Sequence, residues 1–227
     1  MALFLWWSEM ARRYDLIVFD WDGTVMDSTA VIATSIQSAC RDLGLSVPSD
    51  EAARHVIGMG LLQALQHAVP DAPEHMHEPL AERYRHYFLA QDQAIPLFSQ
   101  AAETIAELHR DGYLLAVATG KSRKGLERVM DSSGLRRYFH ASRTADETFS
   151  KPHPAMLLEL MDELGVHSEQ VLMVGDTTHD LQMAINAGVD VVGLKHGAHP
   201  EEQLRALQPL ALLDDFIELR AWFKAHA

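Results

Sequence analysis

Two aspartates, Asp20 and Asp22, stand one residue apart directly after an apolar segment near the start of the chain. They belong to the sequence Asp20-Trp21-Asp22-Gly23-Thr24, and residues 16–19 before it read Leu-Ile-Val-Phe. A carboxylate is costly to bury in an apolar core, but two carboxylates at the end of a buried strand suit a divalent cation and attack on phosphorus. The pair therefore indicates Mg²⁺-dependent phosphoryl transfer. Taken alone, it could also be a turn with a capping aspartate.

Three further polar motifs follow later strands of the same kind. Thr119-Gly120-Lys121-Ser122 comes after the apolar residues 114–118, and Gly175-Asp176-Thr177-Thr178-His179-Asp180 comes after residues 171–174. Lys151-Pro152 lies in a loop after a strand that we expect near residues 138–141. In a doubly wound sheet, ligands bind beyond the carboxyl ends of the strands. The sequence therefore predicts that all four motifs meet at one edge of the sheet.

The residue types in these motifs divide the chemistry of phosphoryl transfer among them. Asp20, at the strand tip, is the candidate nucleophile and would form an aspartyl-phosphate. Asp22 points to the same side and suits general acid and base catalysis. The Thr119 hydroxyl and the backbone amides that begin at Gly120 can bind a phosphate oxygen. Lys151 can bind the phosphate and neutralise the charge that develops on the transferred group.

A pair of acids in the fourth motif completes a candidate metal site. Asp176 and Asp180 lie four residues apart across a loop-to-helix junction, so both can face Asp20. Mg²⁺ prefers hard oxygen ligands and takes few carboxylates. A cation held there would screen Asp20 from the phosphate that it attacks.

Each later motif also has a purely structural interpretation when it is taken alone. Thr119-Gly120 could be a strand-to-helix turn, and Lys151 a solvated lysine before a proline at the first position of a helix. Asp176 and Asp180 could be an N-cap and an acid of the first helical turn. Their common position at successive strand ends favours the catalytic interpretation.

The remaining pattern predicts an α/β fold with a doubly wound, mainly parallel sheet, of the Rossmann-like type. Continuous apolar runs, typical of strands that are covered on both faces, occupy residues 16–19, 114–118, 171–174, 189–194 and, more weakly, 210–213. Helical periodicity lies between or after them at 101–110, 155–164 and 214–224. Strands that alternate with helices indicate a parallel sheet with helices on both sides.

The segment from residue 28 to residue 95 departs from this alternation. It contains no convincing strand, only helical patterns that are interrupted by glycine and proline. We therefore predict an α-helical cap domain at 28–95, inserted into an α/β core formed by 1–27 and 96–227. Two short hinges are expected, after Asp27 and near Pro96.

The composition excludes several classes of partner. The chain has 19 basic and 32 acidic residues, for a net charge of −13, and such a protein repels nucleic acid and anionic membranes. Cys40 is the single cysteine, which favours a reducing compartment. We expect a cytoplasmic monomer or homodimer. The apolar residues 1–7 are too few to span a bilayer, and they could be a leader or a packing or dimer contact.

The four motifs resemble those of the haloacid dehalogenase superfamily of hydrolases. The helical insert is similar to the cap of the subgroup that includes phosphoglycolate phosphatases and β-phosphoglucomutases. The resemblance implies Asp20 as the nucleophile, Asp22 as the acid and base, and Thr119 and Lys151 as phosphate contacts. It also implies Mg²⁺ bound by Asp20, the backbone carbonyl of Asp22 and Asp176, with Asp180 bound directly or through water. Because dehalogenating relatives lack the second aspartate, Asp22 argues against cleavage of carbon–halogen bonds.

The leading hypothesis is a phosphatase that hydrolyses a small phosphorylated metabolite, similar to phosphoglycolate phosphatase. A phosphomutase of the β-phosphoglucomutase type would use the same core residues. A regulatory switch domain with a phosphorylated aspartate is a third possibility, but such domains are about half this length and have no cap.

Several residues outside the motifs are weaker candidates. We expect His179 to support the metal site or to be exposed, and His75 and His77 to lie in an exposed cap loop rather than in a zinc site. Substrate contacts are possible for the histidines and glycines near the predicted cleft and for three arginines that could bind a second anion: His196, His199, Gly58, Gly60, Arg83, Arg85 and Arg123.

Overall fold

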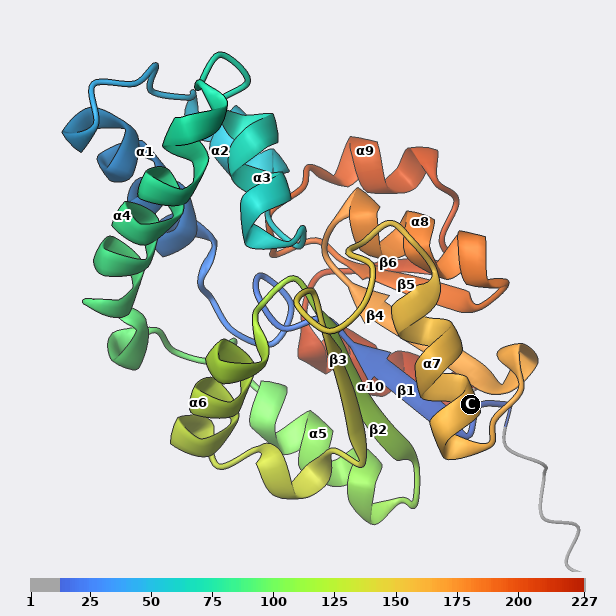
Figure 1. The fold of residues 1–227 in the computed structure, drawn as a ribbon. Helices are drawn as coiled ribbons and strands as arrows, with labels where there is room; N and C mark the ends of the chain where they lie inside the picture. Colours follow the sequence, from blue (N-terminus) through green and yellow to red (C-terminus); the bar gives the residue numbers. More distant parts are fainter. Residues whose placement is uncertain (1–12, 227) are drawn as a thin grey trace, which may run out of the picture.

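A computed structural model describes residues 13–226, and within them six strands form one fully parallel sheet (Figure 1). The strand order is β3-β2-β1-β4-β5-β6. The strands are β1 (Leu16–Phe19), β2 (Leu114–Thr119), β3 (Ala141–Thr144), β4 (Val171–Gly175), β5 (Asp190–Leu194) and β6 (Ala211–Leu213). The order reverses at β1, so β1 and β4 flank the switch point where ligands bind in such sheets. The predicted α/β fold is confirmed.

Helices cover both faces of the sheet because side chains alternate between the faces along each strand. On one face, Ile17 and Phe19 of β1 pack in a cluster that includes residues of α5 (Ala101–Arg110), α6 (Arg123–Ser133) and α10 (Phe216–His226). On the other face, Leu16 and Val18 pack in a cluster with residues of α7 (Ala155–Leu164), α8 (Thr178–Ala187) and α9 (Glu201–Ala206). Continuous apolar runs are therefore needed in the central strands.

Two predicted elements begin two or more residues later than the sequence indicated. The third strand starts at Ala141, and Tyr138, where we expected it, ends a short 3₁₀ helix, η3 (Arg136–Tyr138). This strand lies at the sheet edge and is only partly buried, so it lacks a continuous apolar run. The last helix starts at Phe216 rather than at 214, because the Asp215 carboxylate accepts hydrogen bonds from the amides of Ile217 and Glu218 and so caps the helix.

The insert between β1 and β2 is helical, as predicted (Figure 1). It contains α1 (Thr29–Asp42), α2 (Asp50–His55), α3 (Leu61–Ala68) and α4 (His77–Leu89), with short 3₁₀ helices η1 (Glu74–Met76) and η2 (Asp92–Ala94). The two connections to the core lie side by side, because the Asp27 amide donates to the Pro96 carbonyl at 3.0 Å and the Phe98 amide donates to the Val25 carbonyl at 3.0 Å. The domain limits at 28 and 95 stay a prediction.

Two other expectations concern segments away from the sheet. The apolar residues 1–7, considered as a leader or a packing contact, lie outside the described residues. Within residues 13–226, the helices are all too short or too polar to cross a membrane. His75 lies in η1 and His77 begins α4, and the described residues place neither of them in a group that could share a metal ion.

The core packing generates a test of stability. Leu115, in β2, is fully buried, so Leu115→Ala removes its contacts and leaves a cavity. We expect the free energy of unfolding, measured by urea denaturation, to fall by about 2–5 kcal/mol. The control Leu158→Ala changes a leucine of α7 that is 48% exposed, and it should change this free energy by only about 0.5 kcal/mol. Equal effects of the two substitutions would contradict the burial of Leu115.

Candidate active site

The loop after β1 is folded back on itself and holds Asp20 at the carboxyl ends of the strands. The Asp20 amide donates to the Val174 carbonyl of β4 at 3.0 Å, and the amides of Val25 and Met26 both donate to the Trp21 carbonyl at 2.9 Å. Asp20 is fully buried and Asp22 is 8% exposed. The motif is therefore a tight loop that keeps both acids close to the carboxyl ends of β1 and β4.

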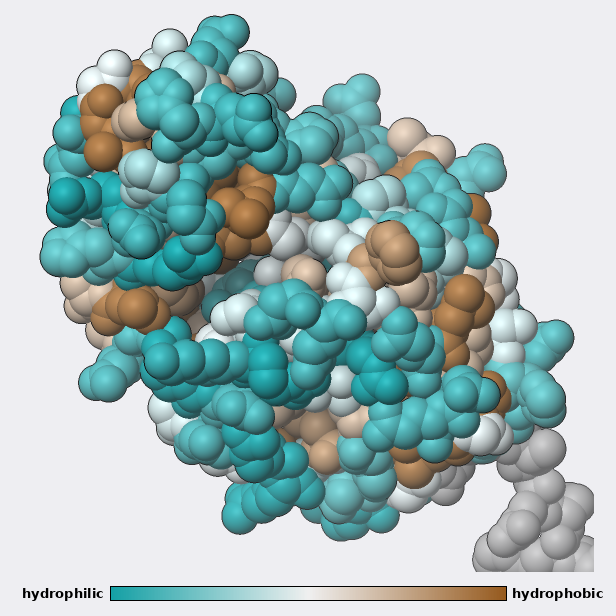
Figure 2. All heavy atoms as spheres, viewed as in Figure 1, coloured by the Kyte–Doolittle hydropathy of each residue, from teal (hydrophilic) through white to brown (hydrophobic). Residues whose placement is uncertain are grey.

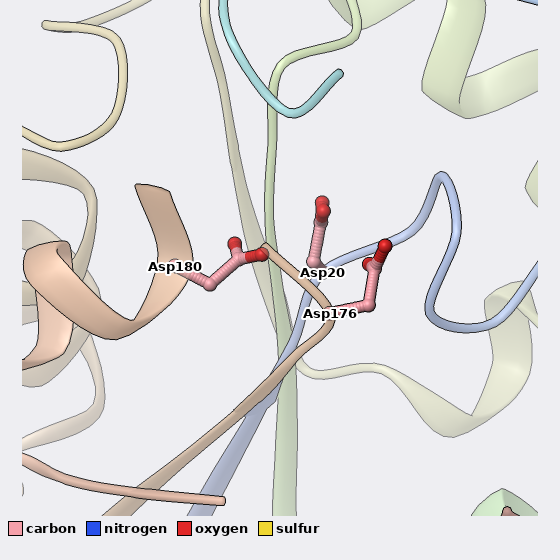
Figure 3. Close-up of side chains that lie close together, drawn as sticks. All are labelled: Asp20, Asp176 and Asp180. Carbon is pink, nitrogen blue, oxygen red and sulfur yellow. The ribbon is translucent and has the colours of Figure 1, made fainter. Parts of the chain in front are cut away.

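Three buried carboxylates meet at this edge. Asp20 comes from the end of β1, Asp176 directly follows β4, and Asp180 lies in the first turn of α8 (Figure 3). One oxygen of each lies within 4.8 Å of the others, and all three side chains are buried. Burial, and to a smaller extent the charge of Asp180, raises the pKa of Asp176 to about 7. The structure thus gathers predicted acids from two strands into one group.

Lys151 supplies the positive charge in this group. Its Nζ lies 2.7 Å from Oδ1 of Asp20 and 2.7 Å from Oδ1 of Asp180, and all three side chains are fully buried. Burial lowers the pKa of Lys151, but Asp180 and Asp20 more than offset this, so its pKa is raised. The ammonium is therefore charged. One lysine cannot balance the charge of three carboxylates, so a further cation would be stabilised here.

The donor set fits a divalent cation such as Mg²⁺. Oδ2 of Asp20 is buried, and no described residue forms a hydrogen bond with it. A buried carboxylate oxygen without a donor is costly, and oxygen ligands are those that Mg²⁺ prefers. Burial raises the pKa of Asp20 despite the opposing charge of Lys151, and Asp180 and Asp176 raise it further. An added cation would relieve this electrostatic cost.

The other two carboxylates are held by hydrogen bonds, Asp176 from the loops after β1 and β5 and Asp180 from Thr177 in its own loop. Asp176 accepts from the Thr24 hydroxyl at 2.6 Å and from the Ala198 amide at 2.7 Å. Asp180 uses Oδ2 to accept from the amide and the hydroxyl of Thr177, at 3.0 and 2.7 Å. Since Lys151 lies against its other oxygen, Asp180 has both oxygens engaged. An ion would therefore meet Asp180 more readily through water than directly.

Two glycines, Gly23 and Gly197, lie so close to the Asp176 carboxylate that a side chain at either position would overlap with it. A Cβ atom at Gly23 would lie 2.3 Å from Oδ2 of Asp176, and one at Gly197 would lie 2.0 Å from the same oxygen. Any other residue at either position would collide with the carboxylate. Gly23 was identified in the sequence as part of a tight turn, whereas Gly197 was not identified, because it lies in the loop after β5 and only the fold brings it to Asp176.

Asp22 lies apart from the three acids and has its own partners. Its Oδ1 accepts from the Ser28 hydroxyl at 2.6 Å and lies 3.0 Å from Nζ of Lys121. Sequence reasoning did not assign a role to either residue. A lysine two residues after Thr119 was a usable signal for Lys121, but its pairing with Asp22 depends on the contact between the loops after β1 and β2.

Thr119 and Gly120 lie where a loop of the cap approaches the core. Thr119 is fully buried. A Cβ atom at Gly120 would lie 2.4 Å from the Met59 carbonyl oxygen and 2.6 Å from that of Gly58. The Gly60 amide donates to the Ser150 hydroxyl at 2.7 Å. The cap loop with Gly58 and Gly60 is therefore seated on the core loops that carry the second and third motifs.

A cluster of histidines joins the cap to the core. His179 and His199 donate from Nε2 to the carbonyl oxygen of His55, at 2.8 and 3.0 Å. The rings of His55 and His199 stack with their centroids 4.8 Å apart. Burial lowers the pKa of His179 and, with the neighbouring His179, lowers that of His199 to about 4. Both rings are therefore neutral and serve to dock α2.

The remaining candidates have partners within the protein. His196 lies 3.1 Å from the Thr24 carbonyl oxygen and stacks on Phe98 beside the connection from the cap. Arg83 pairs with Asp42, Arg85 approaches Glu78 at 3.9 Å, and Arg123 pairs with Glu147. Each of the three arginines therefore lies near a carboxylate of the protein.

A cavity of about 650 Å³ lies between the cap and the core. Its lining includes Asp22, Gly120 and Lys121 of the core, and residues of α1, α3 and α4 of the cap. Figure 2 shows a recess between these two parts of the molecule. The cavity gives a ligand access to Asp22, whereas Asp20, Asp176 and Asp180 are not among the residues that line it.

The fold and the site define a class of hydrolase with a helical cap. Residues 17–194 match the sequence profile of the family described as haloacid dehalogenase-like hydrolase, and the chain belongs to that family. It is 35% identical over 212 residues to a protein of Dickeya dadantii named probable phosphatase IndB, with 90% of this chain and 91% of that protein covered.

Two further relatives are described as phosphoglycolate phosphatases. The protein of Vibrio parahaemolyticus is 32% identical over 215 residues, covering 90% of this chain and 93% of its own. The crystal structure of a predicted phosphoglycolate phosphatase from Haemophilus somnus has a TM-score of 0.82 at 29% identity, covering 92% of this chain and 97% of that one. The predicted membership of the haloacid dehalogenase superfamily is confirmed, and the protein is a hydrolase of the phosphatase class.

The buried acids generate a prediction about pH and Mg²⁺. An acid whose pKa is higher in the folded state binds more protons there than when unfolded, so stability falls as pH rises between the two pKa values. For Asp176 the interval runs from 3.8 to about 7. Without divalent cations, we expect the contribution of this site to the free energy of unfolding to decrease from pH 4 to pH 7.

Mg²⁺ should reverse this trend, because it binds the deprotonated carboxylates. The increase in melting temperature on adding Mg²⁺ in place of EDTA should be larger at pH 7.5 than at pH 5. Calorimetry at both pH values measures it. An increase that is the same at the two pH values would contradict a cation site built on Asp20 and Asp176.

Proposed function

We propose that this protein is a Mg²⁺-dependent phosphatase that hydrolyses a small phosphomonoester through an aspartyl-phosphate on Asp20. The observation that carries the proposal is the state of Asp20. Its carboxylate is fully buried, one oxygen has no hydrogen-bond donor among the described residues, and the other lies 2.7 Å from Lys151. The carboxylate is thus buried and held in place by Lys151, and the oxygen left without such a donor could attack phosphorus.

In the first step, an Asp20 oxygen forms a bond to phosphorus as the bond to the leaving alcohol breaks. The departing oxygen takes a proton from Asp22, which Ser28 and Lys121 hold in the loop after β1. Thr119, the amides that begin at Gly120, and Lys151 are the groups that we propose for binding the phosphate oxygens. Asp20 and Asp176, with Asp180 nearby and the carbonyl of Asp22, are the groups that would hold Mg²⁺, which would supply positive charge beside the phosphate.

In the second step, water replaces the alcohol. Asp22, now deprotonated, takes a proton from the water as its oxygen attacks phosphorus and releases Asp20. The products are the alcohol and inorganic phosphate, and both aspartates return to their starting states. The cap, proposed to span residues 28–95, would exclude bulk water and admit this one molecule.

The relatives named phosphoglycolate phosphatases support a phosphomonoester as the substrate and make 2-phosphoglycolate the first compound to test. A phosphomutase would use the same core residues, and incubation with hexose phosphates distinguishes the two. Free phosphate indicates a phosphatase, whereas an isomerised sugar phosphate without free phosphate indicates a mutase.

Substitution of the proposed nucleophile, Asp20, tests the mechanism directly. Asp20→Asn keeps the volume of the side chain but is a much weaker nucleophile, so release of phosphate should fall by at least about a thousandfold. The loss of mutual repulsion among the acids should leave the variant folded, as judged by circular dichroism. Phosphate release from a panel of phosphomonoesters, with Mg²⁺ and with EDTA, is the measurement.

The matched control is Asp162→Asn, which changes an exposed aspartate on α7 and should leave the rate unchanged. Substantial activity in Asp20→Asn would show that Asp20 does not form the intermediate. Equal rates in Mg²⁺ and in EDTA would contradict the metal requirement.

A further inference from the structure

The cavity next to Asp22 is larger than a two-carbon leaving group needs. Its volume is about 650 Å³, within the range of about 300–1,000 Å³ that is typical of pockets for drug-sized ligands. Because Asp22 and Gly120 belong to its lining, the alcohol part of a substrate whose phosphate meets Asp20 would extend into this space. The size of the cavity therefore limits the size of the alcohol that leaves, and it does not affect how the phosphate is bound.

This volume exists although the cap is seated on the core. The loop at Gly58 and Met59 lies against Gly120, and the Gly60 amide is hydrogen-bonded to Ser150. On the neighbouring side, the His55 carbonyl is held by two core histidines. The cavity is therefore present while the cap is in contact with the core, and it does not result from separation of the two parts.

The wall that the cap contributes is mostly apolar, with Gln63 and Arg85 among its polar members. Figure 2 shows hydrophobic residues gathered on the cap side of the recess. Two leucines of this wall, Leu62 of α3 and Leu89 of α4, are each 45% exposed, which is unusual for apolar side chains that gather in one place. The wall also includes Ile32, Ile36, Val56, Ile57, Leu61 and Phe88. Apolar area of this kind is stabilised by covering it with an apolar ligand.

Part of this wall is aromatic. Tyr84 and Phe88, one turn apart on α4, stack with their ring centroids 5.7 Å apart and their planes inclined by 19°. Both rings line the cavity. Burial raises the pKa of Tyr84, and the charge of Asp22 raises it further. Phe88 is 6% exposed and Nζ of Lys121 lies 4.8 Å from its ring centroid, so Tyr84 is the more accessible of the two residues for contact with an aromatic leaving group.

Among the described residues, four cations line the cavity: Lys121, Arg128 and Arg85 each lie near a protein carboxylate, and Lys124 is the fourth. Nζ of Lys121 lies 3.0 Å from Asp22, and Arg128 lies 2.7 Å from Asp92, whose side chain is 5% exposed. Arg85 approaches Glu78, and Lys124 is exposed at the surface. A carboxylate on the leaving group would have to displace a protein carboxylate from its partner, and an exposed lysine contributes little.

We propose that the preferred substrate is a phosphomonoester of an uncharged alcohol with an aromatic or other bulky apolar body, rather than of a small acid such as glycolate. This rests on the proposed phosphatase function. The reaction is unchanged: water adds to phosphorus, the P–O bond to the alcohol breaks, and the alcohol leaves with a proton. The apolar body packs on α1, α3 and α4, while the phosphate meets Asp20.

Three substrates separate the effect of apolar size from that of charge: ethyl phosphate, 2-phenylethyl phosphate and 2-phosphoglycolate. The first two have alcohols of similar leaving ability and differ in apolar surface. With Mg²⁺ present, kcat/KM for 2-phenylethyl phosphate should exceed that for each of the others by at least about tenfold, since even small apolar groups give discrimination of this order.

A substitution in the wall provides the second arm. Leu62→Lys places an unpaired cation on the apolar wall, so it should lower kcat/KM for 2-phenylethyl phosphate and raise it for 2-phosphoglycolate. We expect the ratio of the two to fall by about tenfold. Damage to the fold would lower both values together, so the opposite changes are diagnostic. The matched control is Leu158→Lys, because Leu158 is 48% exposed on α7 and is not among the residues that line the cavity; its ratio should not change.

The outcomes distinguish this inference from the function on which it rests. Faster hydrolysis of 2-phosphoglycolate than of 2-phenylethyl phosphate, or equal values for the three compounds, would overturn the substrate class while phosphatase activity stands. A ratio that Leu62→Lys leaves unchanged would equally overturn it. If none of the phosphomonoesters releases phosphate with Mg²⁺, the proposed function fails and the substrate class fails with it.

Discussion

The burial of three like charges at the switch point of the sheet is the constraint that shapes the rest of this molecule. Asp20, Asp176 and Asp180 lie within 4.8 Å of one another and are closed off from water, where uncompensated carboxylates are expensive. One lysine offsets part of the charge, and hydrogen bonds fix Asp176 from neighbouring loops and Asp180 from its own loop. The uncovered oxygen of Asp20 is what remains, and it is where a cation and a phosphate would act.

The loops around these acids are built to tight distances. Gly23 and Gly197 leave space for Asp176, and Gly120 lets a carbonyl of the cap come close to the loop after β2. The cap is thus tied to the core at the loops that carry the motifs. The cavity beside them takes most of its polar lining from the core and most of its apolar lining from the cap. In the proposed reaction, Asp22 would act from the core side and the cap side would contact the leaving group.

The central strands could be predicted because each is covered on both faces and so must be apolar throughout, as β1 and β4 are. The edge strand β3 was placed too early, since a half-covered strand carries no such run. The acids, Thr119 and Lys151 could be identified as site candidates because parallel strands place their carboxyl ends together. The partners of Asp22 could not, because the contact of Lys121 with it joins loops that are about a hundred residues apart in the chain.

The sequence by itself determined the class of fold, the helical insert and the residues that could do chemistry, since these follow from local periodicity and from the order of motifs along the chain. Only the tertiary structure decided which oxygen of Asp20 lacks a donor, which glycines make room for Asp176, and how apolar the cavity is. Those properties depend on distances between segments that are remote in sequence. Packing sets such distances, and no local pattern of residues encodes them.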